Sequence, residues 1–94
     1  MTAYFLAFGT VKDPEKLAEY IDRSSPSVAE FGGEFVGVSE QTDVLVGVHP
    51  HQRSAMFTFP DAATCRAWFE SPMYHQLEGL REAAADFVFL VFDV

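Results

Sequence analysis

Basic side chains, cysteine and long apolar runs are all scarce in this chain of 94 residues. Six Lys and Arg stand against fourteen Asp and Glu, so the formal net charge is −8. A field of that sign repels phosphate backbones and anionic lipid surfaces. No apolar run approaches the roughly 20 residues that cross a bilayer, and no signal-peptide pattern is visible. We therefore expect a cytoplasmic protein that binds neither nucleic acid nor membranes.

Motifs for cofactors and for common catalytic machinery are missing as well. The only cysteine, Cys65, cannot form an internal disulfide, which is typical of a reducing compartment. There is no Cys-x-x-Cys pair, no glycine-rich phosphate loop, no nucleophile elbow and no dinucleotide-binding fingerprint. The sequence therefore predicts no cofactor, and it does not identify a reaction.

Apolar side chains are abundant instead. They make up 49% of the chain, and ten of them are Phe. Such a composition is typical of a folded chain with a buried core and argues against disorder. The length is that of one domain, so we expect a single domain over residues 1–94.

Hydrophobic periodicity predicts the order strand, helix, strand, strand, helix, strand. Strands over 3–11 and 86–94 are apolar on both faces, and the strand over 54–59 alternates apolar with polar residues. Residues 34–38 and 44–48 form either one long bent strand or two short ones. This order is that of the ferredoxin-like βαββαβ fold, an α+β fold with a four-stranded antiparallel sheet and both helices on one face.

Local signals place the first helix. Asp13-Pro14-Glu15 predicts its start, with Asp13 as the cap, and the helix should run to about Phe31. Pro26 lacks a backbone donor and should kink or split the helix near Ser24 and Ser25. Gly32-Gly33 predicts the stop.

The second helical region should begin at Asp61, which can cap free backbone amides. Its inward side would include Cys65 and Trp68. Ser71-Pro72 should then restart the chain as a further helical segment. One face of that segment is predicted to carry Met73, Leu77, Leu80 and Ala84.

The predicted sheet has one face without helices, yet the first and last strands direct large apolar side chains toward it. Leaving about five such side chains in water would forgo roughly 1.5 to 3 kcal/mol each. That sum is comparable with the roughly 5 to 15 kcal/mol that separates folded from unfolded domains. We therefore predict a homodimer through the sheet face, with the two sheets packed face to face.

Several short motifs also stand in a particular order along the chain: Asp13-Pro14-Glu15, Glu19-Tyr20, Gly32-Gly33, Phe59-Pro60-Asp61, Trp68-Phe69, Ser71-Pro72-Met73-Tyr74, Leu80-Arg81 and Ala83-Ala84-Ala85. In this order and at these separations they resemble the DUF1330 family, small proteins of the dimeric α/β-barrel superfamily. The resemblance covers nearly the whole chain. It implies the same ferredoxin-like fold and the same face-to-face dimer.

The chain departs from the family where polar side chains are common in it. Phe31 stands where His is frequent, Ile21 where Arg is frequent, Phe69 where Tyr is common and Met73 where Glu is common. These apolar residues leave no acid–base role at those positions. The family is one of unknown function, and its superfamily includes cofactor-independent monooxygenases, haem-handling enzymes, lactone isomerases and ligand-binding regulators, so the fold transfers no reaction.

Four side chains are candidates for a ligand pocket between helices and sheet: Tyr20, Arg53, Trp68 and Tyr74. Arg53 enters the third strand, where a long cationic side chain could meet an anionic ligand. Each candidate also has a structural interpretation. Aromatic residues at helical spacing usually pack in the core, and Arg53 could pair with a surface carboxylate.

The remaining ionisable candidates are the three histidines and the thiol. His49 and His51 would point the same way in an extended chain, as a metal pair requires. Pro50 between them favours a solvated turn, and a third ligand would have to be His75 or a carboxylate. We therefore predict no metal site, an exposed His75, and an inert Cys65 whose pKa is raised by burial.

Two functions remain open. The first is a binding module in which the pocket holds a small apolar or aromatic molecule with room for a negative charge. The alternative is a cofactor-independent monooxygenase-like or isomerase-like enzyme in which a His or Tyr moves a proton. This alternative would lose its acid and base if His49, His51, His75 and Tyr74 all faced solvent.

Overall fold

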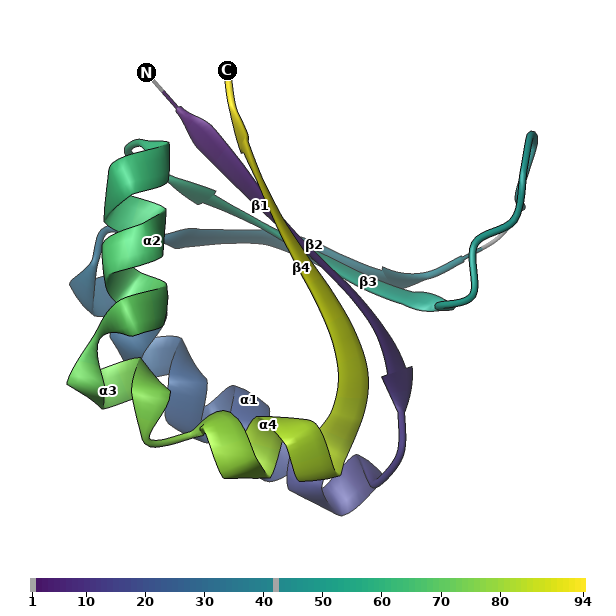
Figure 1. Ribbon diagram of the computed structural model, residues 1–94, viewed down its shortest axis with the longest axis horizontal. Helices are drawn as coiled ribbons and strands as arrows, with labels where there is room; N and C mark the ends of the chain where they lie inside the picture. The colour runs from purple at the N-terminus through teal and green to yellow at the C-terminus, as the bar shows by residue number, and fades with distance from the viewer. Residues whose placement is uncertain (1, 42) are drawn as a thin grey trace.

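A curved sheet with its helices gathered on one side makes up the fold (Figure 1). The computed structural model describes residues 2–41 and 43–94. None of the helices in those two ranges is long and apolar enough to cross a membrane. The elements are β1 (Ala3–Val11), α1 (Pro14–Glu30), β2 (Glu34–Glu40), β3 (Arg53–Phe59), α2 (Ala62–Glu70), α3 (Pro72–His75), α4 (Glu78–Ala84) and β4 (Ala85–Asp93).

The strands lie in the order β2-β3-β1-β4, and every neighbouring pair is antiparallel. This is the ferredoxin-like arrangement that the order of elements predicts. Successive side chains of β1 point to opposite faces of the sheet, so alternate residues face the helices and the helix-free side. Ala3, Phe5 and Ala7 are buried under the helices, whereas Tyr4 on the opposite face is 36% exposed.

The core lies between the helices and the covered face of the sheet. Its three largest fully buried side chains are Tyr74, Phe59 and Leu77. The buried apolar residues are Ala3, Phe5, Ala7, Leu17, Tyr20, Val28, Phe59, Cys65, Trp68, Tyr74, Leu77 and Ala84.

Helix α1 begins and ends as predicted but is not split. The Asp13 side chain accepts hydrogen bonds from the backbone amides of Glu15 and Lys16, and Gly32 ends the helix with φ +74°. The helix continues through Pro26. Proline removes only one backbone donor, and the packing of the buried face on both sides of it, from Leu17 to Val28, holds the helix together.

The prediction of a strand over residues 44–48 is wrong. Strand β2 extends to Glu40 and pairs with β3, but residues 43–52 form no strand. Leu45, Val46 and Val48 are 91%, 94% and 96% exposed. With no neighbouring strand to supply hydrogen bonds, a β-like composition does not make a strand.

The region after Asp61 contains three helices in place of a helix and one further segment. The Asp61 carboxylate accepts from the Thr64 backbone amide at 2.7 Å, and hydrogen bonding to the side chain and the backbone of Thr64 lowers the pKa of Asp61. The chain turns between α3 and α4, so the predicted continuous face is interrupted. Leu77 is buried, but Met73 is 40% exposed, and Tyr74 takes the inward place.

Candidate functional site

A cavity of about 510 Å³ opens between α1 and the helix-covered face of the sheet. That volume lies within the range of small-molecule sites. No carboxylate, imidazole or thiol of the described residues belongs to its lining, which is mostly aromatic and aliphatic. The lining includes Phe5, Leu17, Tyr20, Val28, Phe35, Arg53, Phe57, Trp68, Phe87 and Phe89.

The sheet positions two of these residues through a glycine. Gly9 pairs with Arg53 on one side and with Phe87 on the other. Adjacent strands are about 4.8 Å apart, so Arg53 and Phe87 start about 10 Å from each other on the same face. A Cβ on Gly9 would lie 2.7 Å from the Phe87 ring. The absence of a side chain at position 9 therefore lets the Phe87 ring lie over β1.

Arg53 is the cation at one end of the cavity. It is partly exposed and belongs to the lining. No carboxylate of the described residues forms an ion pair with it. The pairing with a surface carboxylate that would have made Arg53 merely structural is thus not seen in these parts of the chain.

Trp68 forms part of the cavity wall and joins two helices. Its side chain is 2% exposed, and its Nε1–H donates to Ser27 Oγ at 3.0 Å. Ser27 Oγ in turn donates to the Ser24 carbonyl oxygen at 2.6 Å. This relay fixes the indole against α1, because a buried indole N–H needs an acceptor.

Tyr20 and Tyr74 meet in the core through their hydroxyl groups, which share a hydrogen bond. Arg81 donates from a guanidinium nitrogen to the Tyr74 hydroxyl at 3.3 Å. The guanidinium carbon also lies 5.5 Å from the centroid of the Phe69 ring and 5.6 Å from that of Phe89. A cation over aromatic faces is stabilised by their quadrupoles.

These contacts fix the protonation states of the cluster. Burial raises the pKa of Tyr20 far above its ordinary value, and Tyr74 raises it further. Burial by itself would lower the pKa of Arg81, but the hydrogen bond to Tyr74 and the electrostatic attraction of Tyr74, Tyr20 and Glu78 together outweigh it, so the pKa is raised. Tyr20 therefore remains a neutral phenol, and Arg81 remains a cation, at every pH near neutrality.

The four predicted site residues do gather in one region. Tyr20, Arg53 and Trp68 line the cavity, whereas Tyr74 lies behind Tyr20 and is only 1% exposed. The Tyr74 hydroxyl forms hydrogen bonds with the side chains of Tyr20 and Arg81. Arg81 was missed by sequence reasoning, because Tyr74 is in α3 and Arg81 is in α4, so no spacing within a single helix links them.

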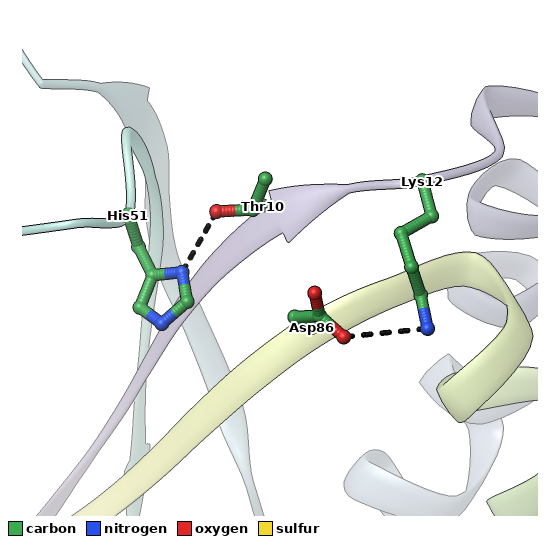
Figure 2. Close-up of polar contacts among 4 residues, drawn as sticks. All are labelled: Thr10, Lys12, His51 and Asp86. Atoms are coloured by element: carbon green, nitrogen blue, oxygen red, sulfur yellow. Dashed lines mark hydrogen bonds and ion pairs between the residues drawn. The ribbon is translucent and has the colours of Figure 1, made fainter.

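The histidines lie away from the cavity. His51 Nδ1 lies 2.8 Å from Thr10 Oγ1, and the nearby Lys12–Asp86 ion pair joins the end of β1 to the start of β4 (Figure 2). The His49 ring packs against Phe8 with centroids 4.7 Å apart, and its Nε2 is buried with no hydrogen-bond partner among the described residues. No group of three metal-ligand side chains occurs in residues 2–41 and 43–94.

His75 and Cys65 behave as predicted. His75 is exposed and lies 3.5 Å from Glu78. Cys65 is 1% exposed, and burial raises the pKa of its thiol to about 11. A thiol that is protonated near neutral pH is a poor nucleophile, so this side chain contributes packing rather than chemistry.

An antiparallel βαββαβ sheet with an apolar cavity beneath its helices defines the chain as a ferredoxin-like α+β protein. Residues 2–94 match the family described as "Domain of unknown function (DUF1330)". The chain belongs to that family, as its motifs suggest. No curated protein is similar to it in sequence.

Solved structures with the same fold have low sequence identity. A protein of unknown function from Rhodopseudomonas palustris is 18% identical with a TM-score of 0.81, over 99% of this chain and 82% of that one. SnoaB, a cofactor-independent oxygenase from Streptomyces nogalater, is 15% identical with a TM-score of 0.71, over 99% and 92%. A dimeric ferredoxin-like protein of unknown function from Jannaschia sp. CCS1 is 13% identical with a TM-score of 0.73, over 100% of both chains. At these identities the likeness is one of fold.

Proposed function

We propose that this protein is a cytoplasmic homodimer that binds a small, mostly apolar or aromatic molecule in the cavity between α1 and the sheet. The observation that carries the proposal is the lining itself. Aromatic and aliphatic side chains form the walls, and Tyr20 and Arg53 are the polar aromatic and the cation of the lining. Small-molecule sites typically combine a large apolar surface with a few placed polar groups. Arg53 offers a partner for an anionic group on the ligand.

An enzyme of the cofactor-independent oxygenase or isomerase kind is the second candidate. The fold shared with SnoaB supports it, and so does the burial of Tyr74, which does not face solvent. Binding is favoured because the described lining contains no carboxylate, imidazole or thiol. The raised pKa of Tyr20 keeps it a neutral phenol, so it does not supply a general base near neutral pH.

The dimer is proposed from the face of the sheet that bears no helices. Its side chains are apolar across three paired strands: Leu6 lies between Met56 of β3 and Leu90 of β4. Met56 and Leu90 are 36% and 39% exposed, and Phe92 is 49% exposed. A second copy of the same face would cover this surface by two-fold symmetry. The dimeric ferredoxin-like protein from Jannaschia sp. CCS1 supports such an assembly.

The segment of residues 43–52, which precedes β3, extends the same surface. It projects from the end of the sheet, on the side away from the helices (Figure 1). Its apolar tip, Leu45, Val46 and Val48, is almost fully exposed, and His49 packs on Phe8, which pairs with Ser54 of β3 and Val88 of β4. In the proposed dimer this segment packs against the second copy.

A thermal-shift experiment with two probes, 1-naphthoate and coumarin, tests the binding function. Ala29 and Ala18 are both exposed on α1, but only Ala29 lines the cavity. We expect at least one probe to raise the Tm of the wild type and of Ala18→Phe. The same probe should not change the Tm of Ala29→Phe, because the new ring occupies the entrance of the cavity. No shift in the wild type, or equal shifts in all three proteins, would contradict binding in this cavity.

A further inference from the structure

The hydrogen bonds that link Arg81, Tyr74 and Tyr20 leave one hydroxyl proton without an acceptor. Arg81 donates to the Tyr74 hydroxyl, and the bond between the two hydroxyl groups uses one of the two phenol protons. The other phenol proton has no acceptor among the described residues. Both side chains are more than nine-tenths buried, so bulk water does not readily supply one.

Geometry decides which hydroxyl carries the surplus proton when a ligand is bound. If both bonds run in the same direction, Arg81 donates to Tyr74 and Tyr74 donates to Tyr20. The free proton then lies on Tyr20, the member of the pair that lines the cavity. The opposite direction would leave the proton on Tyr74, which is not part of the described lining. A ligand can therefore complete the chain only through Tyr20.

We propose that the cavity selects ligands that carry an acceptor oxygen of the carbonyl or carboxylate type, which accepts the surplus proton of Tyr20. Tyr74 and Arg81 are positioning residues: their bonds hold the Tyr20 hydroxyl in the donating direction. This inference rests on the proposed binding function and adds the class of ligand to it. A molecule of the same shape without the oxygen leaves the buried donor unpaired, and such sites discriminate strongly against it.

Two probes of nearly equal shape test this selectivity by isothermal titration calorimetry. 2-Acetylnaphthalene has an acceptor carbonyl where 2-isopropenylnaphthalene has a methylene group. We expect the wild type to bind the ketone about tenfold more tightly, because one well-formed hydrogen bond changes the affinity by about that factor. In Tyr20→Phe the two affinities should be about equal. Tyr4→Phe, on the helix-free face, is the matched control and should keep the wild-type ratio.

The outcomes separate the two proposals. If the wild type binds both probes with equal affinity, the acceptor rule is wrong and the binding cavity remains. If the wild type binds neither, the cavity proposal fails and the acceptor rule falls with it. Tyr74→Phe tests the positioning role through the ratio of affinities, which loss of packing alone would not change, and we expect a ratio between those of the wild type and Tyr20→Phe.

A measurement on the wild type alone guards against variants that fail to fold. A hydrogen bond from a phenol lowers the carbonyl stretching frequency of the ketone. We expect bound 2-acetylnaphthalene to absorb at a lower wavenumber than the same compound in hexane. A bound ketone with the hexane frequency would overturn the assignment of Tyr20 as the donor.

Discussion

Trp68 donates its indole proton to Ser27 across a distance of 3.0 Å, and this contact joins α2 to α1 in the core. Ser27 is fully buried, with 0% of its surface exposed. The two helices are 41 residues apart at this contact, and the cavity lies beside it, with Trp68 in its wall. The hydrogen bond therefore fixes the wall as well as the packing of the helices.

Loss of the Ser27 hydroxyl should destabilise the protein. In Ser27→Ala the buried Trp68 N–H has no acceptor, which costs about 1–3 kcal/mol. Ser25→Ala is the matched control, because Ser25 is on the same helix and its exposed hydroxyl donates to the Ile21 carbonyl oxygen. We expect a change within about 0.5 kcal/mol for the control. Urea unfolding measures both, and equal losses would contradict the proposed role of the contact.

Two glycine-to-alanine substitutions should have opposite signs. A Cβ on Gly33 would lie 2.5 Å from the Val28 side chain and 2.9 Å from the Phe59 ring, and overpacking of this kind costs about 1–3 kcal/mol. At Gly79 nothing lies within 4 Å. Because Gly79 is in α4, alanine there should stabilise the protein by about 0.4–1 kcal/mol. Thermal unfolding of both variants tests the prediction, and a destabilised Gly79→Ala would contradict it.

The fold was largely predictable from the sequence, because strand alternation and capping are local signals. Asp13, Gly32 and Asp61 mark helix ends through the backbone groups that they satisfy. Residues 44–48 could not be predicted in the same way. A strand requires a partner at its edge, and the presence of that partner is not a local property of the sequence.

The thiol of Cys65 should make stability depend on pH in the alkaline range. Its pKa rises from an ordinary value of 9.0 to about 11 on burial. The unfolded chain therefore loses this proton first, so the contribution to stability is complete below pH 9 and is lost as the pH rises toward 11. Tyr20, whose pKa is also raised, adds to the loss at higher pH.

Unfolding measured between pH 8 and pH 11 tests this dependence. We expect the free energy of unfolding to fall with pH in the wild type and to fall less steeply in Cys65→Ala. Alkylation by iodoacetamide provides an independent check, since Cys65 is the only cysteine. Rapid alkylation of the native protein at pH 8 would contradict a buried, protonated thiol.

A charge on the helix-free face should prevent dimerisation without unfolding the protein. Leu90 and Met73 are 39% and 40% exposed, but Leu90 is on the outer face of β4 and Met73 is on α3. Leu90→Glu would bury two carboxylates in the proposed interface, which is costly. We expect light scattering to give twice the 10.5 kDa mass for the wild type and Met73→Glu, and the monomer mass for Leu90→Glu. A monomeric wild type would contradict the dimer.

The candidate site was predictable only in part. The aromatic residues and Arg53 could be identified by type and position. Residue types alone did not distinguish the side chains that line the cavity from those that pack behind them. Tyr74 lies behind Tyr20 because the chain turns between α3 and α4, a break inside what looked like one helical face. The role of Arg81 depends on the same turn, which brings its guanidinium to the Tyr74 hydroxyl.

The most direct test of the account is to locate a bound probe by NMR. Intermolecular nuclear Overhauser effects between 2-acetylnaphthalene and isotope-labelled protein report which side chains surround it. We predict contacts with Val28, Phe57 and Trp68, which line the cavity. Contacts confined to Leu6, Met56 and Leu90 would place the probe on the opposite face of the sheet and contradict the proposed site.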